Sequence, residues 1–312
     1  MPVTPQENNA YREFVVEIAK GLGALDLSGH DIVWHYTDGD GLLGILQSST
    51  LYATQVAALN DSKETEYATD LFREAVRQVI LDKKDDSDAV AFLNAVLEFV
   101  KDEPENPTRG ISKFFVTCFS GQADDVNQWG KYARGTGRYA VGFVPSMLFS
   151  PPSSFLYRVI YDRAKQQQAT KAIAEATLRF YREGLNGERL KEPDLWAREF
   201  FQAWDEWVYR LAPLAKDHRW QSESEFRIVH ELNVSEFPKV RFRQRRTMLS
   251  RYIVLEFPHV VKRRASLLPI AKIMIGPGAH PAFTRVSVKL LLEQMGYPDI
   301  PVEITKCSLT EP

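Results

Sequence analysis

The sequence predicts an α+β fold built on a mixed, mainly antiparallel sheet, with a helical insertion in its middle third. Strand-like runs occur in both halves of the 312-residue chain, whereas helical spacing of apolar residues dominates from Lys165 to Leu214. Strands and helices do not alternate regularly, which argues against a doubly wound parallel sheet. No linker divides the chain, so we expect a single domain over residues 1–312, with a predominantly helical insertion at about residues 163–215.

The first third of the chain is mainly helical, with two short strands. Asp38 is a helix-capping residue type, and Leu42 and Leu46 follow it at helical spacing, whereas residues 51–54 are strand-like. Two prolines in the segment 104–107 break the pattern. The expected elements are a helix over residues 11–22, a strand over 31–36, a helix after 38–40, a strand over 51–54, and helices over 60–81 and 88–100.

The remaining two thirds supply most of the strands. Trp196, Phe200 and Trp204 recur at helical spacing within the insertion, and such an aromatic stripe is typical of core packing. After Trp220 the sequence becomes rich in strands. The expected elements are strands over residues 114–119 and 139–144, helices over 125–133, 165–183, 195–214 and 283–295, and strands over 225–230, 239–245, 252–257, 272–275 and 302–306.

The composition is that of an average globular protein, with 44% hydrophobic residues, 26% charged residues and a formal net charge of −2. It excludes disordered, collagen-like and rod-like proteins, and it argues against a polyanion-binding surface over the whole protein. Cys118 and Cys307 are too few for a disulfide framework, so we expect reduced thiols. Without a signal-peptide pattern or an apolar run of ~20 residues, we expect a cytoplasmic protein with no membrane partner.

Motifs of several enzyme classes are absent. The sequence has neither the phosphate-binding loop G-x-x-x-x-G-K-[ST] nor a G-x-G-x-x-G turn after a strand. Zinc-ligand spacings and the G-x-S-x-G nucleophile motif are also missing. We therefore expect no metal cofactor, and any chemistry must come from polar side chains at the ends of strands.

Two polar clusters lie in the first part of the chain. His35 and Thr37 are two residues apart on an expected strand and therefore share a face. They are either ligand-binding groups at a sheet edge or a hydrogen-bonded structural histidine beside a capping threonine. Asn60 and Asp61, followed by Glu64, are typical of a helix N-terminus, where acidic groups favour the helix dipole.

A third cluster joins a strand end, a polar turn and a short helix. It contains Ser120, the pair Asp124–Asp125, and the aromatic residues Trp129 and Tyr132. These side chains are equally compatible with the wall of a pocket and with ordinary core packing.

A fourth cluster lies at the start of an expected strand after Trp220. Glu223, Glu225 and Arg227 alternate with apolar residues and so fall on one face of that strand. A carboxylate beside the core must be paired, and Arg227 is a candidate partner for Glu225. The alternative is a functional carboxylate that stabilises positive charge or accepts a hydroxyl proton.

Taken in order, these clusters resemble a bacterial family catalogued as domain of unknown function 2971. The matching pattern is H-Y-T before an I-L helix, N-D-x-x-E, C-F-S with D-D, W-x-x-Y-A, G-F, W-x-x-E-x-E-x-R and I-G-P, from about Val33 to Pro277. That family is distantly similar to the ADP-ribosyltransferases, whose sites combine a His, an aromatic residue and a Glu on successive core strands. The resemblance implies a fold of ADP-ribosyltransferase-like type and NAD as the substrate.

The resemblance also implies residue roles. Glu225 would be catalytic, holding the nicotinamide-ribose 2′-hydroxyl and stabilising the oxocarbenium-like ribose, and Glu223 would orient the acceptor. His35 would bind the adenosine ribose, with Thr37 as a supporting polar contact. Four aromatic residues are candidates for stacking on nicotinamide: Tyr36, Phe119, Trp129 and Tyr132. Tyr36, Trp129 and Tyr132, together with Ser120, are the other cofactor-binding candidates.

A basic segment suggests what the acceptor is. Arg241, Arg243 and Arg245 would align with Lys239 on one face of the expected strand, and Arg246 and the basic residues 262–264 add further charge. Phe242 and Tyr252 offer stacking for unpaired bases. The segment is either such a nucleic-acid contact or an exposed sheet face whose charges deter edge pairing.

Two functions follow from these observations. The first is ADP-ribosyl transfer from NAD to a macromolecule, with RNA or DNA ahead of protein, in a toxin or phage-defence effector controlled by an antitoxin or other regulatory protein. The second is a non-catalytic nucleotide or nucleic-acid binding and sensor module on the same fold. In that module Glu225 would only pair with Arg227.

Overall fold

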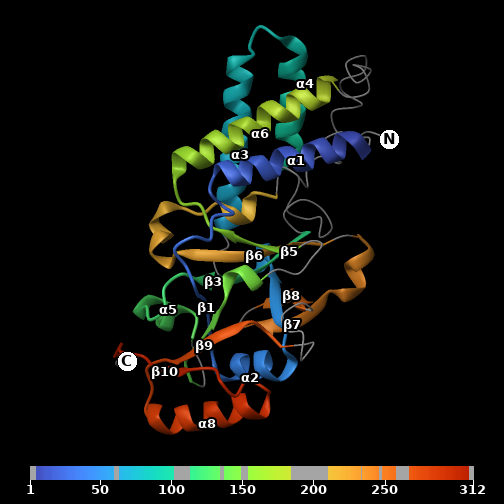
Figure 1. Ribbon diagram of the computed structural model, residues 1–312. Coiled ribbons are helices and arrows are strands. Elements are labelled where there is room, and N and C mark those ends of the chain that lie inside the picture. The colour runs from blue at the N-terminus through green and yellow to red at the C-terminus, as the bar shows by residue number, and fades with distance from the viewer. Residues whose placement is uncertain are drawn as a thin grey trace.

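The protein is layered, with strands in the middle, several helices on one side and two helices on the other, as the computed structural model shows (Figure 1). The structure describes residues 5–59, 63–101, 113–133, 137–148, 154–183, 210–232, 234–245, 248–257 and 267–308. In that part of the chain, every strand pair except β9 (Ile270–Ile275) with β10 (Val302–Ile304) is antiparallel. The expected α+β class with a mixed, mainly antiparallel sheet is confirmed.

The described strands form one sheet of ten strands with a branched order. The other strands are β1 (Val33–Thr37), β2 (Leu51–Gln55), β3 (Phe114–Ser120), β4 (Tyr139–Phe143), β5 (Ser154–Arg158), β6 (Glu225–Glu231), β7 (Arg241–Arg245) and β8 (Met248–Leu255). The main path runs β10-β9-β4-β1-β3-β2-β8-β7, and β6 pairs with both β3 and β5. Strand β3 therefore lies at the branch point.

A fork in the sheet results from the way β3 is shared. One edge of β3 pairs with β6 along its whole length, from Phe114 to Ser120. The other edge pairs with β1 at Ser120 and with β2 at Phe115 and Val116, so β1 and β2 diverge between these points. Near the divergence, a side-chain hydrogen bond joins β3 to β2, because Thr117 Oγ1 donates to the Tyr52 carbonyl at 3.1 Å. The fork places polar groups of three strands near one another.

The helices divide into two layers. On one side of the sheet lie the four long helices of the N-terminal and central parts, and on the other lie α2 and α8 (Figure 1). A short helix, α5, lies beside the end of β3 and starts at the N-cap Asp125, whose side chain accepts from the Gln128 amide. The helix bounds are α1 (Pro5–Gly21), α2 (Gly39–Ser48), α3 (Lys63–Asp82), α4 (Ser87–Lys101), α5 (Val126–Lys131), α6 (Arg163–Glu183) and α8 (Pro281–Gln294).

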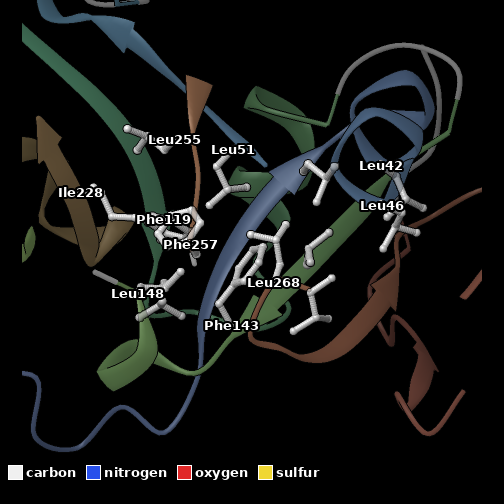
Figure 2. Close-up of a cluster of buried hydrophobic side chains, with 14 of the residues drawn as sticks. Leu42, Leu46, Leu51, Phe119, Phe143, Leu148, Ile228, Leu255, Phe257 and Leu268 are labelled. Atoms are coloured by element: carbon white, nitrogen blue, oxygen red, sulfur yellow. The ribbon is translucent and has the colours of Figure 1, made fainter. Parts of the chain in front are cut away.

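Alternation along β3 separates two cores. Phe114 and Val116 pack with the long-helix layer, in a cluster that includes residues of α1, α3, α4 and α6. Phe115 and Phe119 point to the opposite face, where they belong to a cluster that includes residues of α2 and α8. Figure 2 shows Phe119 within this cluster, together with Leu42 and Leu46 of α2. Period-two alternation in a strand with both faces buried explains why this segment is almost wholly apolar.

Several expected boundaries were wrong. The strand expected from residue 239 begins at Arg241, because Val234–Lys239 forms a 3₁₀ helix that contains Pro238. The last strand ends at Ile304, and β5 was not expected at all. The helix expected over 195–214 lies outside the described residues except at its end, where Ala212–Leu214 is a 3₁₀ helix around Pro213. Among the described residues, no helix is long and apolar enough to cross a membrane.

Gly276, in the I-G-P motif, is packed against the Trp129 ring. A Cβ atom added at Gly276 would lie 2.7 Å from that ring, whereas one at Gly278 would meet nothing within 4 Å. Overpacking of this kind costs about 1–3 kcal/mol. We expect Gly276→Ala to lower the free energy of unfolding in urea by that amount and Gly278→Ala to change it by less than about 0.5 kcal/mol. Equal effects of the two substitutions would contradict the packing.

Candidate functional site

Five buried charged side chains meet where β6 begins, and we call them the ionic cluster. Its members are Glu64, Lys216, Glu223, Glu225 and Arg227, each at most 9% exposed. Glu64 comes from the first turn of α3, Lys216 and Glu223 precede β6, and Glu225 and Arg227 lie on β6. Isolated charges are costly to bury, so each must be paired. The contacts below show that the pairing is extensive.

Arg227 is the centre of one half of the cluster. Its Nε donates to Glu225 Oε1 at 2.8 Å, and its Nη2 donates to Glu225 Oε2 and Glu64 Oε2, each at 2.8 Å. The remaining Nη1 donates to the Pro213 carbonyl at 2.8 Å. The planar guanidinium thus holds Glu225 in a bidentate pair, the strong geometry for an arginine and a carboxylate.

Lys216 joins the three carboxylates. Its Nζ lies 2.8 Å from Glu64 Oε1, 2.7 Å from Glu223 Oε2 and 2.9 Å from Glu225 Oε2. An ammonium group has three donors, and all three are directed at carboxylates here. Lys216 therefore fixes the separation of Glu223 and Glu225.

The outer side of the cluster carries groups that reach solvent. Lys131 Nζ and Tyr132 Oη, both from the end of α5, each lie 3.1 Å from Glu223 Oε1. Lys131 Nζ also lies 4.3 Å from the centroid of the Trp220 ring. The side chain of Lys131 is 37% exposed, as is Tyr132. Of the two carboxylates in E-x-E, Glu223 is therefore the one nearer to solvent-accessible groups.

The paired charges control ionisation in the cluster. Burial would raise the pKa of Glu225, but the positive charges of Arg227 and Lys216 outweigh it and hold the pKa below its usual value. Burial likewise opposes protonation of Lys216, and the surrounding carboxylates, Glu225 first, raise its pKa above the usual value. Burial and the charge of Glu225 raise the pKa of Cys118. At neutral pH Glu225, Lys216 and Arg227 are therefore charged and the nearby Cys118 thiol is protonated.

A backbone turn brings the E-x-E carboxylates to the same lysine. Glu223 was expected on the strand, which is wrong: it ends the 3₁₀ helix His218–Glu223, and Ser224 then adopts a left-handed conformation with φ 44°. Such a conformation is uncommon outside glycine and reverses the chain locally. Ser120 Oγ donates to the Glu223 carbonyl at 2.8 Å, and the Gly121 amide donates to the Ser224 carbonyl at 2.8 Å. Ser120 thus stabilises the turn.

The structure does not bring His35 and Thr37 to the ionic cluster. The register pairs Trp34 with Ser120 and Ser120 with Glu225, so these three share a face of the sheet and His35 points to the other. His35 Nδ1 lies 2.9 Å from the Cys118 carbonyl oxygen, and its ring packs edge-on against Phe119. Burial lowers the pKa of His35, which favours the neutral ring.

Thr37 lies at the end of β1, beside the start of α2. A Cβ atom added to Gly41 would meet Thr37 Oγ1 at 1.9 Å, so the threonine side chain packs against the first turn of that helix. The neighbouring Asp38 caps the helix through the Gly41 amide. This is the location expected for a threonine at a helix start.

The aromatic candidates separate into core and rim. Trp129 is fully buried, packs against Tyr36 at 4.7 Å between ring centroids, and donates from Nε1 to Asp124 Oδ1 at 2.8 Å. The Tyr36 hydroxyl donates to the Gln122 carbonyl at 2.8 Å. Of the two alternatives for this segment, core packing describes Trp129 and Tyr36, whereas Tyr132 lies at the rim of the ionic cluster.

The basic segment forms β7, although not all of its arginines face solvent. Arg241 is exposed, but Arg243 turns over the sheet and donates to Thr54 Oγ1 at 2.7 Å. Arg245 ends β7 in register with Met248. Arg246 and the basic residues 262–264 lie outside the described residues, as do Asn60 and Asp61.

Sequence reasoning missed two members of the cluster. Glu64 was explained as a helix-dipole residue, and it does lie in the first turn of α3, but its carboxylate is buried between Lys216 and Arg227. Lys216 is the first residue of the segment that contains the fourth cluster, but its sequence context assigned it no role. A buried lysine near two glutamates is a recognisable signal only once the fold shows that the three residues are buried together.

Comparison with known proteins finds a family match over part of the chain. Neither the search of curated proteins nor the search of solved structures returns a match. The family match begins within α5, at Gln128, and ends within β6, at Ile228, so it includes four of the five members of the ionic cluster. Residues 128–228 match the model of the family described as "Protein of unknown function (DUF2971)", which is the family that the ordered motifs resemble.

Proposed function

We propose that the protein is an NAD-dependent ADP-ribosyltransferase of ADP-ribosyltransferase-like fold, acting on a nucleic-acid acceptor. The observation that carries the proposal is that the carboxylates of Glu223 and Glu225 both contact the ammonium group of Lys216, beside partly exposed groups. Negative charge fixed before the reaction stabilises positive charge that develops in a transition state.

The charge balance of the cluster supports this chemistry. Its three carboxylates and two cations leave a net charge of −1, and Lys131, the cation that balances it at Glu223, is partly exposed. A ribose that becomes oxocarbenium-like would be attracted to the same site once Lys131 moves aside. The bond from ribose to nicotinamide breaks with its electrons on nicotinamide, and an acceptor oxygen or nitrogen adds to the ribose carbon and loses its proton.

Four residues at or beside the ionic cluster have a defined part in this scheme. Glu223, nearer to the exposed rim, would first meet the substrate, and Glu225 would hold a ribose hydroxyl after Lys216 shifts away from it. Tyr132 Oη, which bonds to Glu223, would orient that carboxylate. Arg227 is a positioning residue, because it holds Glu225 through two bonds.

The test is NAD turnover by the intact chain. Labelled NAD is mixed with single-stranded RNA, single-stranded DNA or protein acceptors, and nicotinamide release and label transfer are measured. We expect Glu223→Gln and Glu225→Gln each to lower turnover by about 10²-fold or more, the loss typical when a preorganised electrostatic contact is removed. Turnover is expressed per folded molecule, with folding measured by near-ultraviolet circular dichroism.

The matched control is Glu231→Gln. Glu231 is on the same strand and face as Glu225, is 7% exposed and is paired with Arg210, so its replacement removes a similar buried charge away from the cluster. We expect this variant to keep most of its turnover. Wild-type turnover in a folded Glu225→Gln protein would overturn the mechanism.

A second function is favoured by one specific observation. Both oxygens of Glu225 already accept from Arg227 or Lys216, and the residue is only 6% exposed. A carboxylate whose two oxygens are both engaged in this way fits a non-catalytic nucleotide or nucleic-acid binding module, in which Glu225 would stabilise the fold. An NAD-dependent rise in the thermal unfolding temperature without nicotinamide release would identify this function instead.

A further inference from the structure

An aromatic and basic site lies on the sheet away from the ionic cluster. Tyr52 of β2 and Tyr252 of β8 have ring centroids 4.6 Å apart at an interplanar angle of 37°. Tyr52 is 42% exposed, and Tyr252 is partly exposed. Register pairs Thr54 with Tyr252, so the two tyrosines are diagonal neighbours on one face. Two adjacent rings with solvent contact form a surface for stacking.

Arg243 adds a fixed positive charge to this surface. Its guanidinium carbon lies 5.4 Å from the Tyr252 ring centroid and 5.8 Å from that of Tyr52. The bond from Arg243 Nη2 to Thr54 Oγ1, 2.7 Å long, holds the side chain across β8. Because the guanidinium is placed beforehand, little side-chain entropy is lost when an anion binds next to it.

The same face extends the positive charge and carries no acid. Arg241 is the register partner of Tyr252 and is exposed. Among the described side chains of β2, β8 and β7, the residues that register places on this face are Tyr52, Thr54, Met248, Ser250, Tyr252, Val254, Arg241 and Arg243. A surface with flat aromatic rings and arginines matches an unpaired base and its phosphates.

We infer that Tyr52, Tyr252 and Arg243 form a binding site for an unpaired base of a single-stranded nucleic acid, with Arg241 at the adjoining phosphate. The inference rests on the nucleic-acid acceptor in the proposed function, and it names the surface that holds this acceptor. Its occupant is a strand without base pairing, because a base in a duplex has no free face for the tyrosines. Binding needs no NAD, so it can be tested separately from transfer.

The experiment is fluorescence anisotropy with a labelled oligothymidylate of about 12 nucleotides at about 50 mM salt. Base stacking on an aromatic ring is lost on substitution by alanine, so we expect Tyr52→Ala and Tyr252→Ala each to weaken binding about 5- to 100-fold. Tyr52→Phe keeps the ring and should bind like wild type. Arg241→Gln should reduce the salt dependence, with a slope of log K against log salt smaller by about 0.7.

Phe242→Ala is the matched control. Phe242 is 61% exposed on the same strand as Arg241 and Arg243 but, by alternation, on the opposite face. This variant should bind like wild type, and a duplex of the same length should bind more weakly than the single strand. Four results would overturn the inference: no oligonucleotide binding, unchanged binding in both tyrosine variants, an equal loss in Phe242→Ala, or equal affinity for thymidine monophosphate. Loss of NAD turnover with intact oligonucleotide binding would instead count against the transferase alone.

Discussion

Replacing Arg227 by Met should lower the free energy of unfolding by about 3–5 kcal/mol, the loss expected when one partner of a buried ion pair is removed. Arg227 is 1% exposed and makes hydrogen bonds to Glu225, Glu64 and the Pro213 carbonyl. Methionine fills similar space but leaves the two carboxylates with Lys216 as their remaining cation in the ionic cluster. The unbalanced negative charge, rather than lost packing, causes the expected effect.

Urea unfolding followed by circular dichroism measures this loss. Arg219→Met is the control, because Arg219 is also an arginine paired with a carboxylate, Asp217, but its side chain is 76% exposed. Exposed pairs contribute about 0–1 kcal/mol, so the control should shift the midpoint little. Similar effects of Arg227→Met and Arg219→Met would show that the ionic cluster does not stabilise the fold. If Arg227→Met is too unstable to purify, Arg227→Lys takes its place in the comparison with Arg219→Met. The lysine keeps the positive charge but loses the bidentate geometry.

Local sequence patterns predicted much of the fold because they reflect local rules. The apolar run that became β3 and the alternation around Phe226 specify strands and their faces without knowledge of distant residues. The Asp38 N-cap likewise specified the start of α2. The predicted strand boundary was wrong where a 3₁₀ helix precedes the strand, as it does before Arg241.

The candidate site depended on information that local patterns do not contain. Glu64 and Arg227 are 163 positions apart, and only the packing of α3 near the start of β6 brings them together. The convergence of Glu223 and Glu225 on Lys216 depends on the left-handed Ser224, a conformation that serine does not signal. The opposite orientation of His35 follows from the pairing of Trp34 with Ser120, which sequence spacing leaves open.

From the sequence alone, Trp129 could either line a pocket or pack in the core. A substitution at this position tests the core placement that the structure shows. Trp129 is fully buried against Tyr36 and Gly276 and donates to Asp124. Truncation of a buried tryptophan costs about 3–5 kcal/mol through lost burial and the cavity left behind. We therefore expect Trp129→Ala to lower the free energy of unfolding by that amount, with Trp129→Phe losing less because most of the ring remains.

The control and the readout distinguish packing from ligand contact. Phe283→Ala removes an aromatic side chain that is 76% exposed on α8 and should leave the free energy of unfolding within about 0.5 kcal/mol of wild type. Because Trp129 belongs to the core, Trp129→Phe should retain NAD binding in proportion to its folded fraction, as measured by calorimetry at a temperature where the variant is folded. A Trp129→Ala protein with wild-type stability and no NAD binding would instead place this ring in the wall of the nucleotide site. The loss of stability thus decides between the two interpretations, because only a ring enclosed by protein leaves a cavity when it is removed.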